Sequence, residues 1–321
     1  MSRLTMTQLR VALIGCGARG RGHLKTLGKF ADVEVAALCD PVAAARDAAG
    51  EAFGIGLRYE TVDELLDQVQ LDAVFVATPA HLNGPAALQC LQRGLHTLLE
   101  KPPGMRVAET RQLQETAVQT GAKAMVGWNR RFHPLIVQAR EAVEAQGAIT
   151  QLVGEFHKSM AALAGSGRFP EIVMDNMLLE TPIHAIDVVR AMAGAEVREV
   201  HAITRRAISR YKDVYAALVL FENGCVAQLT ANYTTGARLE RYEIHGQGVS
   251  AYLEGVSQGT LVSQGETLAL SDEGDGGMYA QTRFFLDCVK EDRPIGLPAA
   301  NLDEAIKTMA LAEAILSGVR D

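Results

Sequence analysis

The first third of the chain alternates short, continuously apolar runs with longer segments whose apolar residues recur at helical spacing. Continuous apolar runs bounded by turn residues are typical of parallel strands that are buried on both faces. Strands that alternate with helices predict a doubly wound parallel sheet. The predicted strands are Val11–Ile14, Val33–Cys39, a short strand near Leu57, Asp72–Thr78, His96–Glu100 and Lys123–Trp128. The predicted helices run from Gly20 toward Phe30, over Ala43–Phe53, from the capping box Thr61–Glu64 to Val69, over about Pro85–Gln92 and over Val107–Thr120.

The pattern changes at about Ile149, where strand-like runs begin to follow one another with turns between them. Asn223-Gly224 separates two of these runs and is a strong hairpin signal. The predicted strands are Ile149–His157, Val197–Arg205, Val214–Phe221, Cys225–Tyr233, Arg241–His245, Ser250–Leu253 and Gly259–Val262, with a loop over Met160–Pro170 and helices at Ile183–Met192, Tyr279–Lys290 and Asn301–Ser317. We therefore expect an α/β chain of two domains, residues 1–125 and 126–321, the second an α+β domain with a large, mostly antiparallel open sheet.

A glycine turn joins the first predicted strand to the first predicted helix. Gly15, Gly17 and Gly20 fit the spacing G-x-G-x-x-G, and Asp40 closes the next strand. In a dinucleotide site the first glycine allows the tight turn, the second leaves room for a pyrophosphate, and the third lets the helix pack closely on the strand. The helix start, at Ala18, Arg19 and Gly20, then offers unpaired N–H groups to the phosphates.

The glycine spacing alone also occurs in ordinary turns. The flanking strand, helix, second strand and acid instead favour a Rossmann dinucleotide site. Asp40 can accept hydrogen bonds from an adenosine ribose and should repel a 2′-phosphate, and no arginine directly follows it in Pro41-Val42-Ala43. We therefore expect NAD rather than NADP.

Composition limits the remaining classes of function. The 321 residues are 48% apolar, enough for sizeable cores, and the net charge of −7 argues against nucleic acid or an anionic membrane as the main partner. No apolar run approaches the roughly 18 residues of a transmembrane helix, and residues 1–10 lack the hydrophobic stretch of a secretory signal. The five cysteines are scattered and never paired as in metal sites. These features predict reduced thiols, a cytoplasmic location and no metal site.

Three predicted strands end in polar or proline-containing segments. In an open parallel sheet the ligand lies outside the carboxyl ends of the strands. Thr78-Pro79 ends one strand, Glu100-Lys101-Pro102-Pro103 the next, and Trp128–Phe132 the last. Lys101 would place a cation where the nicotinamide end is expected. A solvated lysine is the alternative, and the two prolines that fix the turn favour a functional role.

A second polar cluster lies over Glu180–Asp187. At 100° per residue, Glu180, His184 and Asp187 fall within about 60° of one another on a helical wheel. Thr181 and Pro182 are expected at the N-cap and first helical position. In the first turn of a helix the dipole disfavours the protonated imidazolium form of His184. The neutral imidazole is the form that a general base for an alcohol needs. A start capped by Asp175 or Asn176, a polar stripe on an amphipathic helix and a Glu/His/Asp metal site are the other interpretations.

Several of these motifs together resemble the glucose–fructose oxidoreductase / inositol dehydrogenase / rhizopine-catabolism (Gfo/Idh/MocA) family along nearly the whole chain. The matching segments are Gly15-x-Gly17-x-x-Gly20, Ala77-Thr78-Pro79, Glu100-Lys101-Pro102, Asn129-Arg130-Arg131-Phe132, His184-Ala-Ile-Asp187 and a C-terminal helix with Ala305, Ala310 and Ala314. The resemblance implies a nicotinamide-dependent oxidoreductase of sugars, polyols or related hydroxy compounds. It also implies an open second sheet whose face commonly forms dimers or tetramers. Because the second half has few predicted helices to cover such a sheet, we expect a homodimer or homotetramer through residues in the Val197–Leu253 region.

The resemblance assigns roles to individual residues. Lys101 would contact the reacting hydroxyl or carbonyl, His184 would exchange its proton, and Glu180 would orient its neighbours. The implied cofactor-binding residues beyond the glycine turn and Asp40 are Thr78, Pro79, Asn83, Glu100, Lys101, Trp128 and Arg130. Three positions depart from the family pattern: Glu180 replaces an aspartate, Pro182 a glycine and Asn83 a histidine. A cofactor-binding sensor without turnover, and a reductase of a non-sugar carbonyl, an imine or a dihydrodiol-type substrate, are the alternatives.

Overall fold

The computed structural model describes residues 8–160, 167 and 169–320. The chain forms two compact units. The first comprises Met1–Gly127 and Met278–Ile306, and the second comprises Trp128–Gly277 and Lys307–Asp321. The chain therefore leaves the first unit after β6 and returns to it with α10 (Met278–Lys290). Most of the predicted loop Met160–Pro170 lies outside the described residues.

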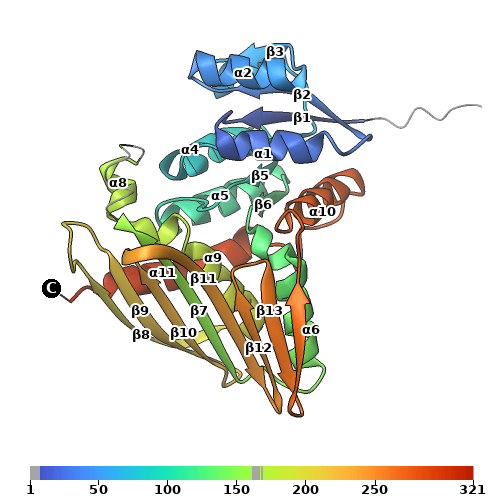
Figure 1. Ribbon diagram of the computed structural model, residues 1–321. Helices are drawn as coiled ribbons and strands as arrows, with labels where there is room; N and C mark the ends of the chain where they lie inside the picture. The colour runs from blue at the N-terminus through green and yellow to red at the C-terminus, as the bar shows by residue number, and fades with distance from the viewer. Residues whose placement is uncertain (1–7, 161–166, 168, 321) are drawn as a thin grey trace, which may run out of the picture. The chain divides into compact units, whose positions relative to one another are not determined.

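The first unit contains a six-stranded parallel sheet (Figure 1). Its strand order is β3-β2-β1-β4-β5-β6, so the chain reverses direction across the sheet between β1 and β4. Ile14 at the end of β1 pairs with Cys39 on one side and Val76 on the other, so the segments that follow these strands leave the same edge. The strands are β1 (Leu9–Ile14), β2 (Val33–Cys39), β3 (Leu57–Tyr59), β4 (Ala73–Val76), β5 (His96–Leu99) and β6 (Ala124–Val126). This confirms the predicted doubly wound sheet.

The helices of the first unit follow from local signals. The predicted capping box at Thr61 and Glu64 is present at the start of α3. The prediction for α4 was wrong at its N-terminus, because the helix begins at Ala80 and contains Pro85, which was expected to open it. Pro85 costs that helix the bond that a backbone N–H would make there. The helices are α1 (Ala18–Leu27), α2 (Ala43–Phe53), α3 (Val62–Gln68), α4 (Ala80–Gln92), α5 (Val107–Thr120) and α10.

The second unit contains an eight-stranded sheet of order β14-β13-β12-β11-β7-β10-β9-β8. Every neighbouring pair is antiparallel except β7 and β10, which are parallel. The turn at Asn223-Gly224 joins β9 to β10 as predicted, with Gly224 at φ +85°. The strands are β7 (Gln151–Ser159), β8 (Val197–Arg205), β9 (Val214–Phe221), β10 (Val226–Asn232), β11 (Thr234–Gly246), β12 (Val249–Glu254), β13 (Gln258–Ser263) and β14 (Glu266–Ser271). β14 was not predicted, and β11 is much longer than the predicted Arg241–His245.

Helices pack against this sheet through α9 and α6. The predicted helix at Ile183–Met192 is α9 (Ile183–Ala193), and the helix predicted at Asn301–Ser317 is α11 (Leu302–Ser317). Three shorter elements and one full helix were missed: η1 (Asn129–Phe132), α6 (Pro134–Glu144), α8 (Glu171–Met174) and η2 (Met177–Leu179). None of the described helices has both the length and the apolar character that crossing a membrane would require.

Candidate active site

The glycine turn has the geometry that its three positions predict. Gly15 adopts φ +97°, and a Cβ there would lie 2.5 Å from the carbonyl oxygen of Ala77. A Cβ at Gly20 would overlap the carbonyl oxygen of Gly15, so the helix can approach the turn only without a side chain. A Cβ at Gly17 would meet nothing within 4 Å. The turn is therefore closed at Gly15 and Gly20 and open at Gly17, which fits a pyrophosphate at the second glycine.

The start of α1 offers backbone donors at this opening. Gly17 is the N-cap and supplies no side-chain cap, so the first amides of Ala18–Leu27 are not satisfied by a capping side chain. Four N–H groups of a helix start lack intrahelical partners and carry the positive end of the helix dipole. The residues present therefore fit the phosphates of a dinucleotide.

Asp40 lies beside this turn and is tied to the backbone. Its carboxylate accepts hydrogen bonds from the amides of Cys16 at 2.7 Å and of Val42 at 2.8 Å. These bonds hold the end of β2 against the glycine turn. Each carboxylate oxygen can accept further bonds. The carboxylate is thus held beside the turn by two backbone bonds and keeps acceptor capacity. The role of Asp40 as a ribose ligand stays a prediction.

A buried charged cluster supports the end of β5. Glu100 is only 3% exposed and receives Arg19 Nε at 2.5 Å and His23 Nε2 at 2.9 Å. Burial alone would raise the pKa of Glu100, but the charges of Arg19 and Lys101 and the contact with His23 lower it to about 2. Glu100 is thus an anion that joins α1 to the end of β5. Arg19 and His23 were not expected in this role.

Lys101 follows Glu100 at the same edge of the sheet as the glycine turn. The Lys101–Pro102 peptide bond is cis. Asn83 is buried, accepts a hydrogen bond from Thr78 Oγ1 at 2.9 Å and donates to the carbonyl oxygens of Lys101 and Pro102 at 3.4 and 3.3 Å. Asn83 therefore connects the loop after β4, which contains Pro79, to the turn that carries Lys101. Direct contacts of Thr78, Pro79 and Asn83 with a cofactor stay predictions.

In the second unit, His184 lies in the first turn of α9, as predicted. Its amide donates to the carbonyl oxygen of Thr181 at 3.0 Å, and its side chain is buried. The predicted capping was wrong: the N-cap is Pro182, with no side-chain cap bond. Thr181 instead shares its hydroxyl with Lys158 and Glu180. The alternative start at Asp175 or Asn176 is also wrong, because α8 and η2 occupy that segment as separate short elements.

Glu180 was expected on the same helical stripe as His184, and this was wrong. Glu180 directly follows η2 and lies before the start of α9, so it is not part of the helix that carries His184. Its carboxylate receives Lys158 Nζ at 3.2 Å, and the same ammonium lies 2.6 Å from Thr181 Oγ1. The glutamate that replaces the family's aspartate is therefore held by a lysine from the end of β7.

The third polar residue of the predicted cluster, Asp187, is part of a buried ion pair. Arg131 of η1 donates to it twice, through Nε at 2.8 Å and Nη2 at 2.7 Å, and Thr308 Oγ1 donates at 2.9 Å. Asp187 thus anchors α9 to η1. Among the described residues no group of His, Cys, Asp and Glu could hold a metal ion, so the metal interpretation of Glu180, His184 and Asp187 has no support in the structure.

Trp128 and Arg130, two of the predicted cofactor ligands, lie in the second unit. Trp128 is buried, with the guanidinium of Arg131 5.9 Å from its ring centre. Arg130 donates two hydrogen bonds to the carboxylate of Glu240 in β11, through Nε at 2.9 Å and Nη2 at 3.2 Å. Burial alone would lower the pKa of Arg130, but Glu240 raises it. Their contact with a cofactor stays a prediction.

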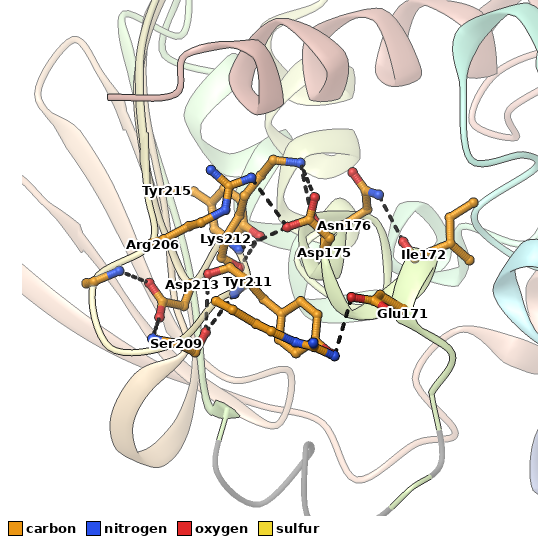
Figure 2. Close-up of polar contacts among 12 residues, drawn as sticks. Glu171, Ile172, Asp175, Asn176, Arg206, Ser209, Tyr211, Lys212, Asp213 and Tyr215 are labelled. Atoms are coloured by element: carbon orange, nitrogen blue, oxygen red, sulfur yellow. Dashed lines mark hydrogen bonds and ion pairs between the residues drawn. The ribbon is translucent and has the colours of Figure 1, made fainter. Parts of the chain in front are cut away.

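The segment that leads to Glu180 is fastened to the loop between β8 and β9. Figure 2 shows Lys212 and Arg206 directed at Asp175 from that loop, with contacts of 2.9 and 3.7 Å. Tyr233 Oη also donates to the carbonyl oxygen of Met177 at 2.9 Å. These bonds fix the path of the chain just before Glu180.

Lys158 is the main functional candidate that the sequence analysis missed. Leu152, Gly154 and Phe156 of β7 are buried, and Lys158 continues that alternation on the same face. A lysine in an apolar register of a strand is a detectable signal, because a charge there needs a partner.

Models of known protein families match segments of both units. Residues 9–128 match the family model described as "Oxidoreductase family, NAD-binding Rossmann fold", and residues 136–252 match the GFO/IDH/MocA C-terminal domain. The rhizopine catabolism protein MocA of Rhizobium meliloti is 30% identical over 60% of this chain and 59% of its own length. UDP-N-acetylglucosamine 3-dehydrogenase of Acidithiobacillus ferrooxidans is 30% identical over 75% of this chain and 72% of its own.

A solved structure of the Acidithiobacillus ferrooxidans UDP-N-acetylglucosamine 3-dehydrogenase GnnA superimposes with a TM-score of 0.83 at 23% identity, covering 97% of this chain and 98% of that one. This likeness shows the shared fold. The chain spans about three fifths of the length of the first curated relatives that it matches. The two family models together, with the relative that is 30% identical over most of its length, show that the chain belongs to the Gfo/Idh/MocA oxidoreductase family, with an NAD-binding Rossmann domain.

Proposed function

We propose that the chain is an NAD-dependent dehydrogenase that oxidises a secondary alcohol of a sugar, a polyol or a related hydroxy compound. The observation that carries the proposal is the edge of the first sheet. The glycine turn after β1 and Lys101 after β5 lie at the same carboxyl edge, and the anionic Glu100 precedes Lys101. Ligands of doubly wound sheets bind at this edge, where the strand order reverses.

Lys101 and His184 divide the chemistry of alcohol oxidation. When bound, NAD supplies the nicotinamide that accepts the hydride. His184 accepts the hydroxyl proton as general base, and Lys101 stabilises the negative charge that develops on the oxygen. Glu180, held by Lys158, accepts a hydrogen bond from a second substrate hydroxyl and so orients the reacting carbon.

The proposal also includes the expectations about cofactor, partners, cellular location and oligomeric state. NAD is preferred over NADP because Asp40 is anionic beside the glycine turn. The substrate is a small molecule, and nucleic acid and membrane play no part in its binding. The protein works in the cytoplasm as a homodimer or homotetramer.

A panel of neutral sugars, polyols and hydroxy acids, assayed by NADH absorbance, tests the proposal. At least one compound should reduce NAD, and Lys101→Ala should lower kcat/KM by about 100-fold or more because it removes a charge that matters most in the transition state. Lys123→Ala is the matched control, since Lys123 lies in the same unit and pairs with Asp292 at 2.5 Å. A Lys101→Ala enzyme with unchanged turnover would refute the assignment, and NAD binding without any turnover would favour the sensor alternative.

A further inference from the structure

Two cations lie over one buried phenyl ring in the second unit. Lys158 Nζ is 5.6 Å from the ring centre of Phe156, and the guanidinium of Arg238 is 5.3 Å from the same centre. Phe156 is fully buried. Like charges repel one another in surroundings of low dielectric constant, so neighbouring or bound anions stabilise such a pair.

A bulge in β11 brings Arg238 to this position. Thr234 pairs with Ser159 and Leu239 with His157, so the segment between Thr234 and Leu239 is longer than the β7 segment that it faces. Thr235 Oγ1 donates to the carbonyl oxygen of Lys158 at 3.0 Å and pins the bulge to the end of β7. Bulges often re-aim a side chain beside an active site.

The two cations differ in how their carboxylate partners are shared. Lys158 is paired with Glu180. Glu240, however, is shared between Arg130, at 2.9 Å, and Arg238, at 3.0 Å. Among the described residues, Glu240 is therefore a single carboxylate that two guanidinium groups contact. Arg130 is mostly buried, whereas the side chain of Arg238 is 58% exposed, so Arg238 is the guanidinium of the two that an anion from solution can reach.

Lys158, which lies over the same ring as Arg238, contacts residues assigned to the substrate. Lys158 contacts both Glu180 and Thr181, and the helix with His184 begins at Ile183. We propose that Lys158 and Arg238 form an anion-binding subsite, and that the substrate is an acidic sugar or polyol derivative whose carboxylate or phosphate binds there. A guanidinium binds either group through two parallel hydrogen bonds. The inference rests on the proposed function and narrows its substrate class.

Matched substrates test the inference. Glucose and galactose, their uronates and their 6-phosphates share a ring and differ in charge. With wild-type protein and NAD, at least one anionic member should show a higher kcat/KM than its neutral counterpart. Arg238→Gln should lower kcat/KM for that anion by about 10- to 100-fold, mainly through KM, because a charged hydrogen bond is lost. The neutral counterpart should change by less than about twofold, since it makes no ionic contact there.

Arg241→Gln is the matched control. Arg241 lies on the same strand but on the opposite face of the sheet, where it contacts Glu155 and Glu243. It should leave both substrates unaffected. Lys158→Met should lower kcat/KM for neutral and anionic compounds alike, because Glu180 loses the lysine that holds it. It should lower kcat/KM for the anionic compound further, because one of the two cations is lost. An equal loss for both classes would show that Lys158 does not bind the anion and would overturn the two-cation subsite.

The outcomes separate this inference from the proposed function. Oxidation of neutral sugars in preference to their acids, with no effect of Arg238→Gln, refutes the subsite and leaves the dehydrogenase standing. If no compound is oxidised, the proposed function fails on this panel, and calorimetry of glucuronate and glucose 6-phosphate with the NADH-loaded protein decides the subsite. Binding that weakens in Arg238→Gln supports it, and absent or unchanged binding refutes it.

Discussion

Replacing Glu100 with glutamine should destabilise the protein strongly at neutral pH and hardly at all in acid. Glu100 is buried at the end of β5 and bonded to Arg19 and His23. Glutamine has nearly the same shape as a protonated glutamate. The substitution therefore removes the charge while keeping the packing, and it isolates what the anion contributes to folding.

The size of the effect follows from the pKa of Glu100, which lies at about 2 instead of the ordinary 4.5. At about 1.4 kcal/mol per pKa unit this corresponds to about 3 kcal/mol of stability. A carboxyl group whose pKa is lowered by folding stabilises the folded state above its unfolded pKa. That stability is lost as the pH falls from about 4.5 toward about 2.

Urea unfolding of wild type and Glu100→Gln, followed by circular dichroism across this pH range, measures the difference. The gap in unfolding free energy should be about 3 kcal/mol at pH 7 and should close toward pH 2, where both side chains are neutral. Glu34→Gln is the control, because Glu34 pairs with Arg10 at 2.8 Å with both side chains exposed. It should cost less than about 1 kcal/mol. A gap below about 1 kcal/mol at pH 7, or one that stays constant with pH, would refute the account of Glu100.

Three further predictions concern the cofactor, the base and the assembly. Asp40→Ser with Pro41→Arg should lower the preference for NAD over NADP by about tenfold or more, because a like-charge contact is replaced by an attractive one; calorimetry showing that the unaltered protein already prefers NADP would contradict this. His184→Ala should lower kcat by about 10²–10⁴ with NAD affinity unchanged and should abolish the acidic limb of the kcat/KM profile; retention of both rate and limb would exclude His184 as the base. Leu218 and Ile203 are 51% and 53% exposed on neighbouring strands of the second sheet, so Leu218→Glu should dissociate the proposed oligomer in light scattering, whereas a wild-type monomer at micromolar concentration would contradict the proposal.

The sequence predicts most of the fold because each main strand carries its own signal. β1 and β4 are continuous apolar runs, and β9 alternates buried and exposed residues. β14 escaped prediction because only Leu270 of its six residues is buried, so an edge strand of this kind shows no apolar pattern. α6 does carry helical spacing, with Pro134 at its start and buried residues at Leu135, Ile136, Ala139 and Val143, and could have been found.

The candidate site was less predictable, because its local signals say nothing of partners distant in sequence. The dinucleotide turn was predicted since its glycines, helix and acid are neighbours along the chain. The partners of Glu180 and Glu100 could not be read in the same way. Lys158 precedes Glu180 by 22 residues, and Arg19 precedes Glu100 by 81. Only the folded chain shows that each acid is held by a cation from another element.

The segment Glu180–Asp187 shows why residue type alone does not assign a role. Its three ionisable side chains suggest one stripe, yet the structure gives Glu180 and Asp187 separate partners. Asp187 makes a buried double contact with Arg131, and Glu180 contacts Lys158. Removing one partner of a buried ion pair typically costs about 3–5 kcal/mol. Loss of Asp187 would therefore reduce activity by loosening α9 from η1, whereas loss of His184 would remove the proposed proton acceptor from a helix that stays in place.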